Sequence, residues 1–166
     1  MDIILIGRAA ESGTLEYVDS RRDELAGKYS VRYLSQGIGR LTAEFADDEC
    51  MRVLTKAGCD VFIVGRRGLA PALWALGQTL SCGLRVCAEL IPISQFAVEM
   101  AELRDENPLY TGSLGCVLAC CESGFELAEK LSRQGYPATV IGYTTDDNIR
   151  GLNNHGTLTF LTPDEA

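Results

Sequence analysis

Four consecutive residues, Gly65, Arg66, Arg67 and Gly68, combine two glycines with two cationic side chains. Guanidinium groups donate forked hydrogen bonds that suit phosphate or carboxylate. Glycines allow the tight turn that would present both side chains at one place. The four residues therefore predict an anion-binding turn. The alternative is an ordinary turn with solvated arginines, since short motifs of this kind are common.

The residues on either side of this turn predict a strand before it and a helix after it. Val61–Val64 are apolar and predict a short buried strand. The helix has one leucine face, and Pro71 is tolerated in its first turn. The leucines of that face are Leu69, Leu73, Leu76 and Leu80. A strand that turns into a helix directs backbone N–H groups and the positive end of the helix dipole toward an anion.

The composition is that of a soluble globular protein. The chain has 166 residues, 46% hydrophobic and 23% charged, which predicts a single domain over residues 1–166. A net charge of −8 argues against nucleic acid and anionic membranes as partners. No apolar run reaches the ~18–20 residues of a membrane helix. The N-terminus, MDIILIGR, lacks the basic leader and long apolar core of a signal peptide. We therefore expect a cytoplasmic protein.

Seven cysteines and one histidine are the residues that could bind a metal or act as a nucleophile. No two cysteines form a CxxC pair, and Cys116 and Cys120 fall in a predicted strand, so we expect no metal site. Reduced thiols that pack in the core are the expectation for a cytosolic chain. His155 falls in a predicted hairpin turn, which favours a role in the turn. A Cys–His catalytic pair that uses it stays open as the alternative.

The rest of the chain alternates between strand and helix signals. Further strands are expected at 2–6, 84–91, 116–121 and 138–143, with a terminal hairpin of 149–152 and 157–161. Helices are expected within 9–27, with a start at Ser20 and a stop at Gly27, at 44–57, after Ser94, and from Ser123 to Gly135. This order of elements leaves both the α/β and the α+β class open.

Several stretches resemble, in order, the C-terminal domain of AIR synthase-related proteins. They are Gly7–Thr14, Ala57–Val61 with Arg66–Leu69, Cys82–Ile93, Asn107–Tyr110 and Gly135–Gly142. The superfamily includes AIR synthase, selenophosphate synthetase, thiamine-monophosphate kinase and the hydrogenase maturation factor. The resemblance covers nearly the whole chain. It implies an α+β fold, a mixed β-sheet flanked by helices that is loosely ferredoxin-like.

The resemblance also implies a function at a cleft between two domains of an ATP-using enzyme. Gly65, Arg66, Arg67 and Gly68 would hold phosphate groups there, and Thr111, Gly112 and Ser113 would line the same cleft. ATP and Mg²⁺ would bind only with an N-terminal domain, which carries most of their ligands in this superfamily. For the chain alone no cofactor is expected, and no catalytic residue is identified.

The sequence departs from the family pattern in three ways. It lacks the N-terminal domain, its glycine turn is shorter, and its end lacks the terminal cysteine of the hydrogenase maturation factor. We therefore expect the chain to be inactive alone and to form a homo-oligomer or to bind a missing N-terminal domain. A non-enzymatic binding or scaffold module that kept the fold is the alternative. A redox or metal sensor that uses the cysteines is the third hypothesis.

Overall fold

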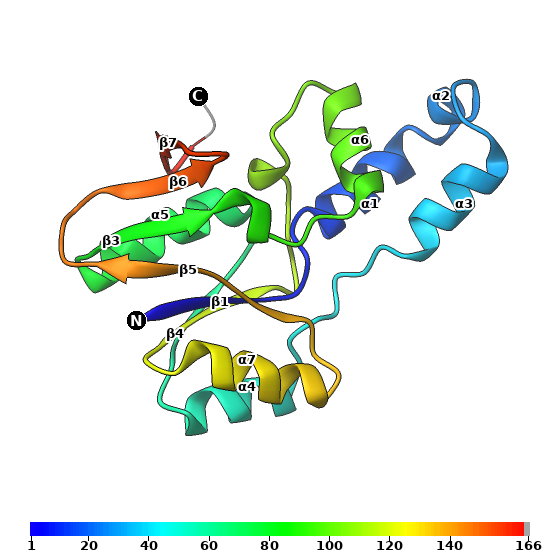
Figure 1. The fold of residues 1–166 in the computed structure, drawn as a ribbon. Coiled ribbons are helices and arrows are strands. Elements are labelled where there is room, and N and C mark those ends of the chain that lie inside the picture. Colours follow the sequence, from blue (N-terminus) through cyan, green and yellow to red (C-terminus); the bar gives the residue numbers. More distant parts are fainter. Residues whose placement is uncertain (165–166) are drawn as a thin grey trace.

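A mixed seven-stranded sheet forms the centre of the molecule in the computed structural model, which describes residues 1–164 (Figure 1). The strand order is β2-β4-β1-β5-β3-β6-β7. The strands are β1 (Asp2–Ile6), β2 (Asp60–Ile63), β3 (Gly83–Cys87), β4 (Val117–Cys121), β5 (Ala138–Thr145), β6 (Arg150–Asn154) and β7 (Thr157–Phe160). The expected α+β class with a mixed sheet is confirmed.

Helices surround the sheet. They are α1 (Glu11–Ser20), α2 (Arg22–Ala26), α3 (Val31–Gly39), α4 (Asp48–Lys56), α5 (Leu69–Leu80), α6 (Gln95–Leu103) and α7 (Gly124–Arg133). Two short 3-10 turns, η1 (Ala88–Leu90) and η2 (Pro108–Tyr110), interrupt the connections. Within residues 1–164 no helix combines the length and the apolar character needed to cross a bilayer.

Strand directions decide which loops meet. β4 lies between β1 and β2 and is antiparallel to both. β5 is likewise antiparallel to β1 and β3, whereas β3 and β6 are parallel. Consequently the residues that follow β1 and β2 and those that precede β4 gather at one end of the sheet.

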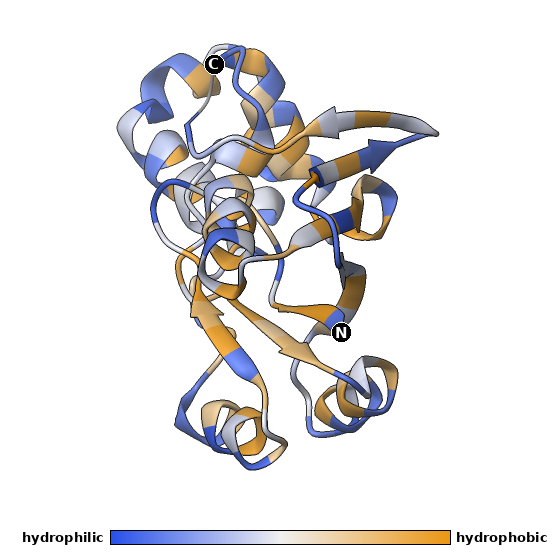
Figure 2. Ribbon diagram, turned by 90° about the vertical axis from the view of Figure 1, so that its left-hand side faces the viewer, coloured by the Kyte–Doolittle hydropathy of each residue, from blue (hydrophilic) through white to orange (hydrophobic). Residues whose placement is uncertain are grey.

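The sheet separates two hydrophobic cores. Alternate residues of β1 face opposite sides, so Ile3 and Leu5 pack in the core under α5. Ile4 and Ile6 pack on the other side with α4 and α7 (Figure 1). Hydrophobic residues accordingly predominate along the central strands in Figure 2. A third cluster joins α1, α3 and α6 beside the sheet around Met100.

Several expected elements are confirmed. They include β1, β4, α5, the helix capped by Ser94, and the terminal hairpin. Ser94 accepts a hydrogen bond from the N–H of Ala97, and Asp47 caps α4 in the same way through Cys50. Helix α4 itself is shorter than the expected 44–57.

Other expectations at this level are wrong. Ser20 ends α1 instead of starting a helix. The expected buried strand at 61–64 is the edge strand β2, where the Ile63 side chain is 77% exposed. The strand expected to reach residue 91 ends at Cys87, because η1 follows. Ser123 makes no capping hydrogen bond; at this end of α7 the carboxylate of Asp2 accepts the N–H of Gly124.

Candidate functional site

The turn Gly65–Gly68 and the loop Thr111–Ser113 meet at one end of the sheet. The backbone N–H of Ser113 donates to the carbonyl oxygen of Gly65 across 3.0 Å. Gly112 lies so close that a Cβ atom there would be 3.3 Å from the Arg66 carbonyl oxygen. The structure thus brings together the two segments that were expected to line one cleft.

A third segment, the loop that follows β1, joins them. The N–H of Ala10 donates to Ser113 Oγ at 2.8 Å, and the N–H of Gly13 donates to the Gly112 carbonyl oxygen at 2.9 Å. The N–H of Leu114 donates to Ser12 Oγ at 2.8 Å. Sequence reasoning did not assign this loop to the site, although the resemblance over Gly7–Thr14 was a signal for it.

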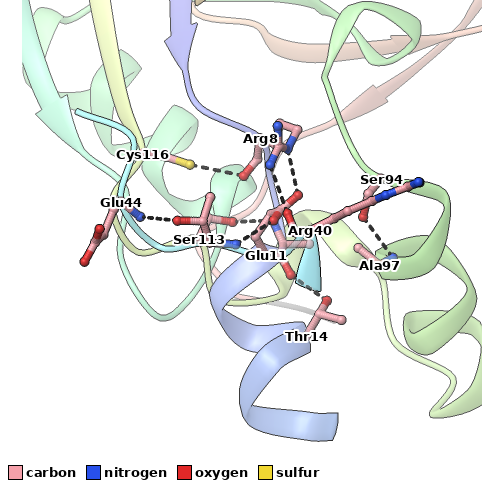
Figure 3. A network of polar contacts seen from close by, with 11 residues as sticks. Arg8, Glu11, Thr14, Arg40, Glu44, Ser94, Ala97, Ser113 and Cys116 are labelled. Carbon is pink, nitrogen blue, oxygen red and sulfur yellow. Dashed lines mark hydrogen bonds and ion pairs between the residues drawn. The ribbon is translucent and has the colours of Figure 1, made fainter. Parts of the chain in front are cut away.

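A buried carboxylate holds the β1 loop in place. Glu11 is 1% exposed and accepts from Arg8 Nε at 2.8 Å and from the Thr42 N–H at 2.9 Å (Figure 3). Arg8 also donates to the carbonyl oxygen of Arg40 at 3.2 Å. Charge-assisted hydrogen bonds of this kind compensate for burying a carboxylate. Glu11 therefore has a structural role.

The side chains of Thr111 and Ser113 point into the protein. Ser113 is 1% exposed, and its hydroxyl donates to the Thr111 carbonyl oxygen at 3.0 Å. Thr111 is 4% exposed, and its Oγ1 accepts from Arg104 Nη2 at 3.1 Å. Both hydroxyls thus stabilise the loop, and Gly112 is its half-buried residue.

The two arginines of the turn diverge. Arg66 has a 77% exposed side chain, and its Nη1 lies 3.7 Å from Glu16 Oε1. Arg67 forms an ion pair with Asp164 and donates to the carbonyl oxygen of Pro163 at 2.9 Å. Each guanidinium group therefore has a carboxylate partner of its own.

Gly68 sits under the loop at the start of α5. Its φ is +97°, and a Cβ atom there would lie 2.5 Å from the carbonyl oxygen of Leu109. Its N–H donates to the carbonyl oxygen of Gly65 at 3.2 Å, which closes the turn. Glycine at this position is therefore required by the close approach of η2 and by the backbone angle.

Arg66 lies on the wall of an open groove of about 490 Å³ between α1 and the loop that precedes β4. Arg104 lies beside it, with its guanidinium carbon 4.6 Å from the centre of the Tyr17 ring and its Nε 2.7 Å from Glu106 Oε2. Because Arg104 is largely buried and paired, Arg66 is the exposed cation of this groove. Glu16 and Glu106 balance the two positive charges.

The cysteines and the histidine do not form a metal site. Among residues 1–164, no group of three or more His, Cys, Asp or Glu side chains is arranged to hold an ion. All seven cysteines are free thiols. Burial raises the pKa of Cys116 and of Cys120 to about 12, so neither has the lowered pKa of a reactive thiol.

His155 lies in the hairpin turn between β6 and β7, as expected. Its Nδ1 is 3.1 Å from Glu89 Oε1, and the Cys87 thiol donates to the other oxygen of Glu89 at 2.9 Å. This hydrogen bond is the main cause that raises the pKa of Cys87 above its ordinary value. The alternative of a Cys–His catalytic pair thus receives no support at Cys87.

Comparison with known proteins identifies relatives by fold. No family model matches the sequence, and no curated protein matches it. HypE from E. coli, a hydrogenase maturation protein, superimposes with a TM-score of 0.77 and 17% identity, over 99% of this chain and 50% of that one. HypE in complex with ATP superimposes with a TM-score of 0.68 and 18% identity, over 99% of this chain and 51% of that one. Thiamine-monophosphate kinase from Stenotrophomonas maltophilia superimposes with a TM-score of 0.64 and 15% identity, over 95% of this chain and 51% of that one.

These solved structures belong to AIR synthase-related proteins, and the fold of this chain matches their C-terminal domain. The chain spans about half the length of each of them. At identities below 25%, the likeness establishes the shared fold alone.

Proposed function

We propose that this chain is the C-terminal domain of an AIR synthase-related, ATP-using enzyme. In this proposal it contributes a phosphate-binding turn at an inter-domain cleft and is inactive alone. The fold, shared over 99% of the chain with HypE, supports this assignment, and HypE has been solved with ATP. Because the chain covers about half of HypE, an N-terminal domain would supply the rest of the site.

The observation that carries the phosphate site is the hydrogen bond between Ser113 and Gly65. It fixes the glycine turn against the Gly112 loop and leaves Arg66 exposed at the edge of the groove. The Arg66–Glu16 contact is an exposed pair at 3.7 Å, and such pairs contribute little stability. Arg66 can therefore exchange Glu16 for a phosphate at low cost.

Arg67 has a smaller part in this proposal. To contact a phosphate it must leave both Asp164 and the carbonyl oxygen of Pro163. Gly65 and Gly68 shape the turn, whereas Thr111 and Ser113 support it from inside the protein. In this proposal Arg66 is the one arginine that contacts the phosphate, and the backbone of the turn holds it in position.

ATP and Mg²⁺ belong to the proposal only when an N-terminal domain completes the cleft. Mg²⁺ would neutralise charge on the phosphates, held by carboxylates of that domain, as the family resemblance implies. This chain would bind and orient the phosphates through Arg66 and through the turn.

Calorimetric titration tests the proposal. ATP–Mg²⁺ and inorganic phosphate would be added to this chain alone and to its mixture with the half of HypE that it does not cover. We expect ATP–Mg²⁺ to bind in the mixture and Arg66→Ala to weaken it about tenfold or more, because a charge-assisted hydrogen bond is lost. Arg52→Ala is the matched control, since Arg52 is 73% exposed and also pairs with a glutamate. Equal binding by wild type and Arg66→Ala, or no binding in the mixture, would contradict the phosphate role.

Self-association is a further part of the proposal. Large apolar side chains are exposed at Ile63, Phe125 and Phe160, which are 77%, 71% and 71% exposed. Exposed apolar surface drives association, so we expect a homo-oligomer in the absence of a partner domain. Light scattering measures this, and a monomer at high concentration would contradict it. A cytoplasmic location, without nucleic acid or membrane as partner, completes the proposal.

The divergence of Arg66 and Arg67 favours a second candidate function, a non-enzymatic binding or scaffold module. Each arginine is already paired with a carboxylate of this chain, Glu16 or Asp164. This candidate predicts a stable complex without nucleotide turnover. ATP hydrolysis by the purified chain, abolished by Arg66→Ala, would exclude it.

A further inference from the structure

Cys59 and Cys121 face each other across two neighbouring antiparallel strands. The register pairs Asp60 of β2 with Cys120 of β4, so the next position places Cys59 opposite Cys121. Both side chains pack in the core on the α4 and α7 side. We propose that this pair is a thiol oxidation site that closes into a cross-strand disulfide. The proposal does not depend on the proposed function.

The strand register is compatible with a disulfide between Cys59, which directly precedes β2, and Cys121. Residues directly opposite each other in an antiparallel pair have Cα atoms roughly 4.5–5.5 Å apart, within the roughly 4.4–6.8 Å that disulfides span. Cys120 cannot replace Cys121, because side chains alternate along a strand and Cys120 packs in the opposite core. The partner of Cys59 is therefore determined by the strand register.

A small oxidant can approach the pair from outside. Cys121 is 9% exposed and lines an open pocket of about 390 Å³ together with Gly58, Ser123 and Lys130. Glu122 and Glu126 line the same pocket and offset the ammonium charge of Lys130, so the pocket does not select a reagent by its charge. A small-molecule disulfide such as oxidised glutathione is the class of oxidant that can reach Cys121 through this open pocket.

The reaction proceeds by thiol–disulfide exchange. The Cys121 thiolate attacks one sulfur of oxidised glutathione, the glutathione S–S bond breaks, and one glutathione leaves as a thiolate that takes up a proton. The Cys59 thiolate then attacks Cys121 Sγ and releases the second glutathione. The two protein thiols lose two electrons and two protons, and one small disulfide is reduced to two thiols.

The second step is the slow one. Burial, with the Cys121 sulfur as the next cause, raises the pKa of Cys59 to about 12. Cys59 is therefore a thiol at neutral pH, and its thiolate fraction rises about tenfold with each pH unit below that pKa. Closure is expected to accelerate accordingly between pH 7 and pH 9.

Peptide mapping of the folded full chain after incubation with oxidised glutathione tests the inference. Trypsin releases Cys59 in peptide 57–66 and Cys121 in peptide 105–130. We expect the free thiols to fall by two from seven and fragmentation to link Cys59 with Cys121. A reductant should restore all of them.

Two variants serve as controls. Cys82→Ala leaves the pair intact and should cross-link like wild type. Cys59→Ser, checked for folding by circular dichroism, should stop at a mixed disulfide on Cys121. The inference is overturned if wild type retains seven thiols, if glutathione stays on Cys121 with Cys59 free, or if the bond joins other cysteines.

Discussion

The backbone N–H of Ser113 donates to the carbonyl oxygen of Gly65 across 3.0 Å, and this bond ties the loop before β4 to the turn after β2. The hydroxyl of the same serine accepts the N–H of Ala10 in the loop after β1. One residue thus connects the ends of three strands. Sheet topology explains why, since β4 runs between β1 and β2 in the opposite direction.

Ser113→Ala should destabilise the protein by about 1–3 kcal/mol. The substitution leaves the N–H of Ala10 without its acceptor in a position where Ser113 is 1% exposed. Urea unfolding followed by circular dichroism measures the free energy of unfolding. Ser132→Ala is the control, because Ser132 is an exposed residue of α7 whose hydroxyl makes only a 3.5 Å hydrogen bond to the carbonyl oxygen of Ala138. Equal effects of the two substitutions would show that the buried hydrogen bond contributes nothing.

Gly68→Ala should cost more stability than Gly58→Ala. Both glycines have positive φ, +97° and +77°, but a Cβ at Gly68 would lie 2.5 Å from the Leu109 carbonyl oxygen, whereas at Gly58 nothing lies within 4 Å. Backbone strain alone costs about 1–2 kcal/mol, and overpacking adds about 1–3 kcal/mol at Gly68. Thermal and urea unfolding of both variants provide the comparison. A difference close to zero would mean that η2 shifts freely away from the turn.

Hydrophobic periodicity and capping residues were sufficient to predict the helices that show these patterns in their own sequence. Helix α5 was predicted because its leucines recur on one face, and α6 because Ser94 caps it. Helix α3 was missed, since Val31–Gly39 contains two glycines and no buried residue. It is stabilised by contacts of Tyr33 and Leu34 with the third cluster, and those contacts depend on the tertiary fold.

The candidate site could be predicted only in part for a similar reason. The turn and the Gly112 loop were expected to line one cleft because of the resemblance to AIR synthase-related proteins. The partners that separate Arg66 from Arg67 are Glu16 and Asp164, which are distant in sequence. No spacing rule relates these residues, so the divergence of the arginines becomes visible only in three dimensions.

Glu11→Gln should destabilise the protein by about 1.5–3 kcal/mol. The buried carboxylate accepts from Arg8 and from the Thr42 N–H, and an amide presents one acceptor oxygen and a donor in its place. Glu16→Gln on the same helix is the matched control, because Glu16 is 63% exposed and should change stability by less than about 0.5 kcal/mol. Urea unfolding of both variants measures this. A Glu11→Gln protein as stable as wild type would contradict the anchoring role of Glu11.

Glu89 should make stability depend on pH in the acid range. Hydrogen bonds lower its pKa to about 2 from the usual 4.5, with the Cys87 thiol as the main donor, then the backbone N–H groups of Glu89 and His155. The unfolded chain therefore binds a proton at this carboxyl at higher pH than the folded chain does. The contribution of Glu89 is complete above pH 4.5 and is lost as the pH falls toward 2. Glu89→Gln should accordingly lower the free energy of unfolding near neutral pH and have no effect on it near pH 2.

An NMR titration of the Glu89 side-chain carboxyl measures this pKa directly, and urea unfolding at several pH values measures the linked change in stability. Cys87→Ala is the informative variant, because it removes the main hydrogen bond and should raise the pKa of Glu89 toward 4.5. The contact between Glu89 and His155 in the β6–β7 turn remains in that variant. A wild-type pKa near 4.5 would show that the thiol and the carboxylate are not hydrogen-bonded in solution, and the acid dependence would then have to come from other carboxylates.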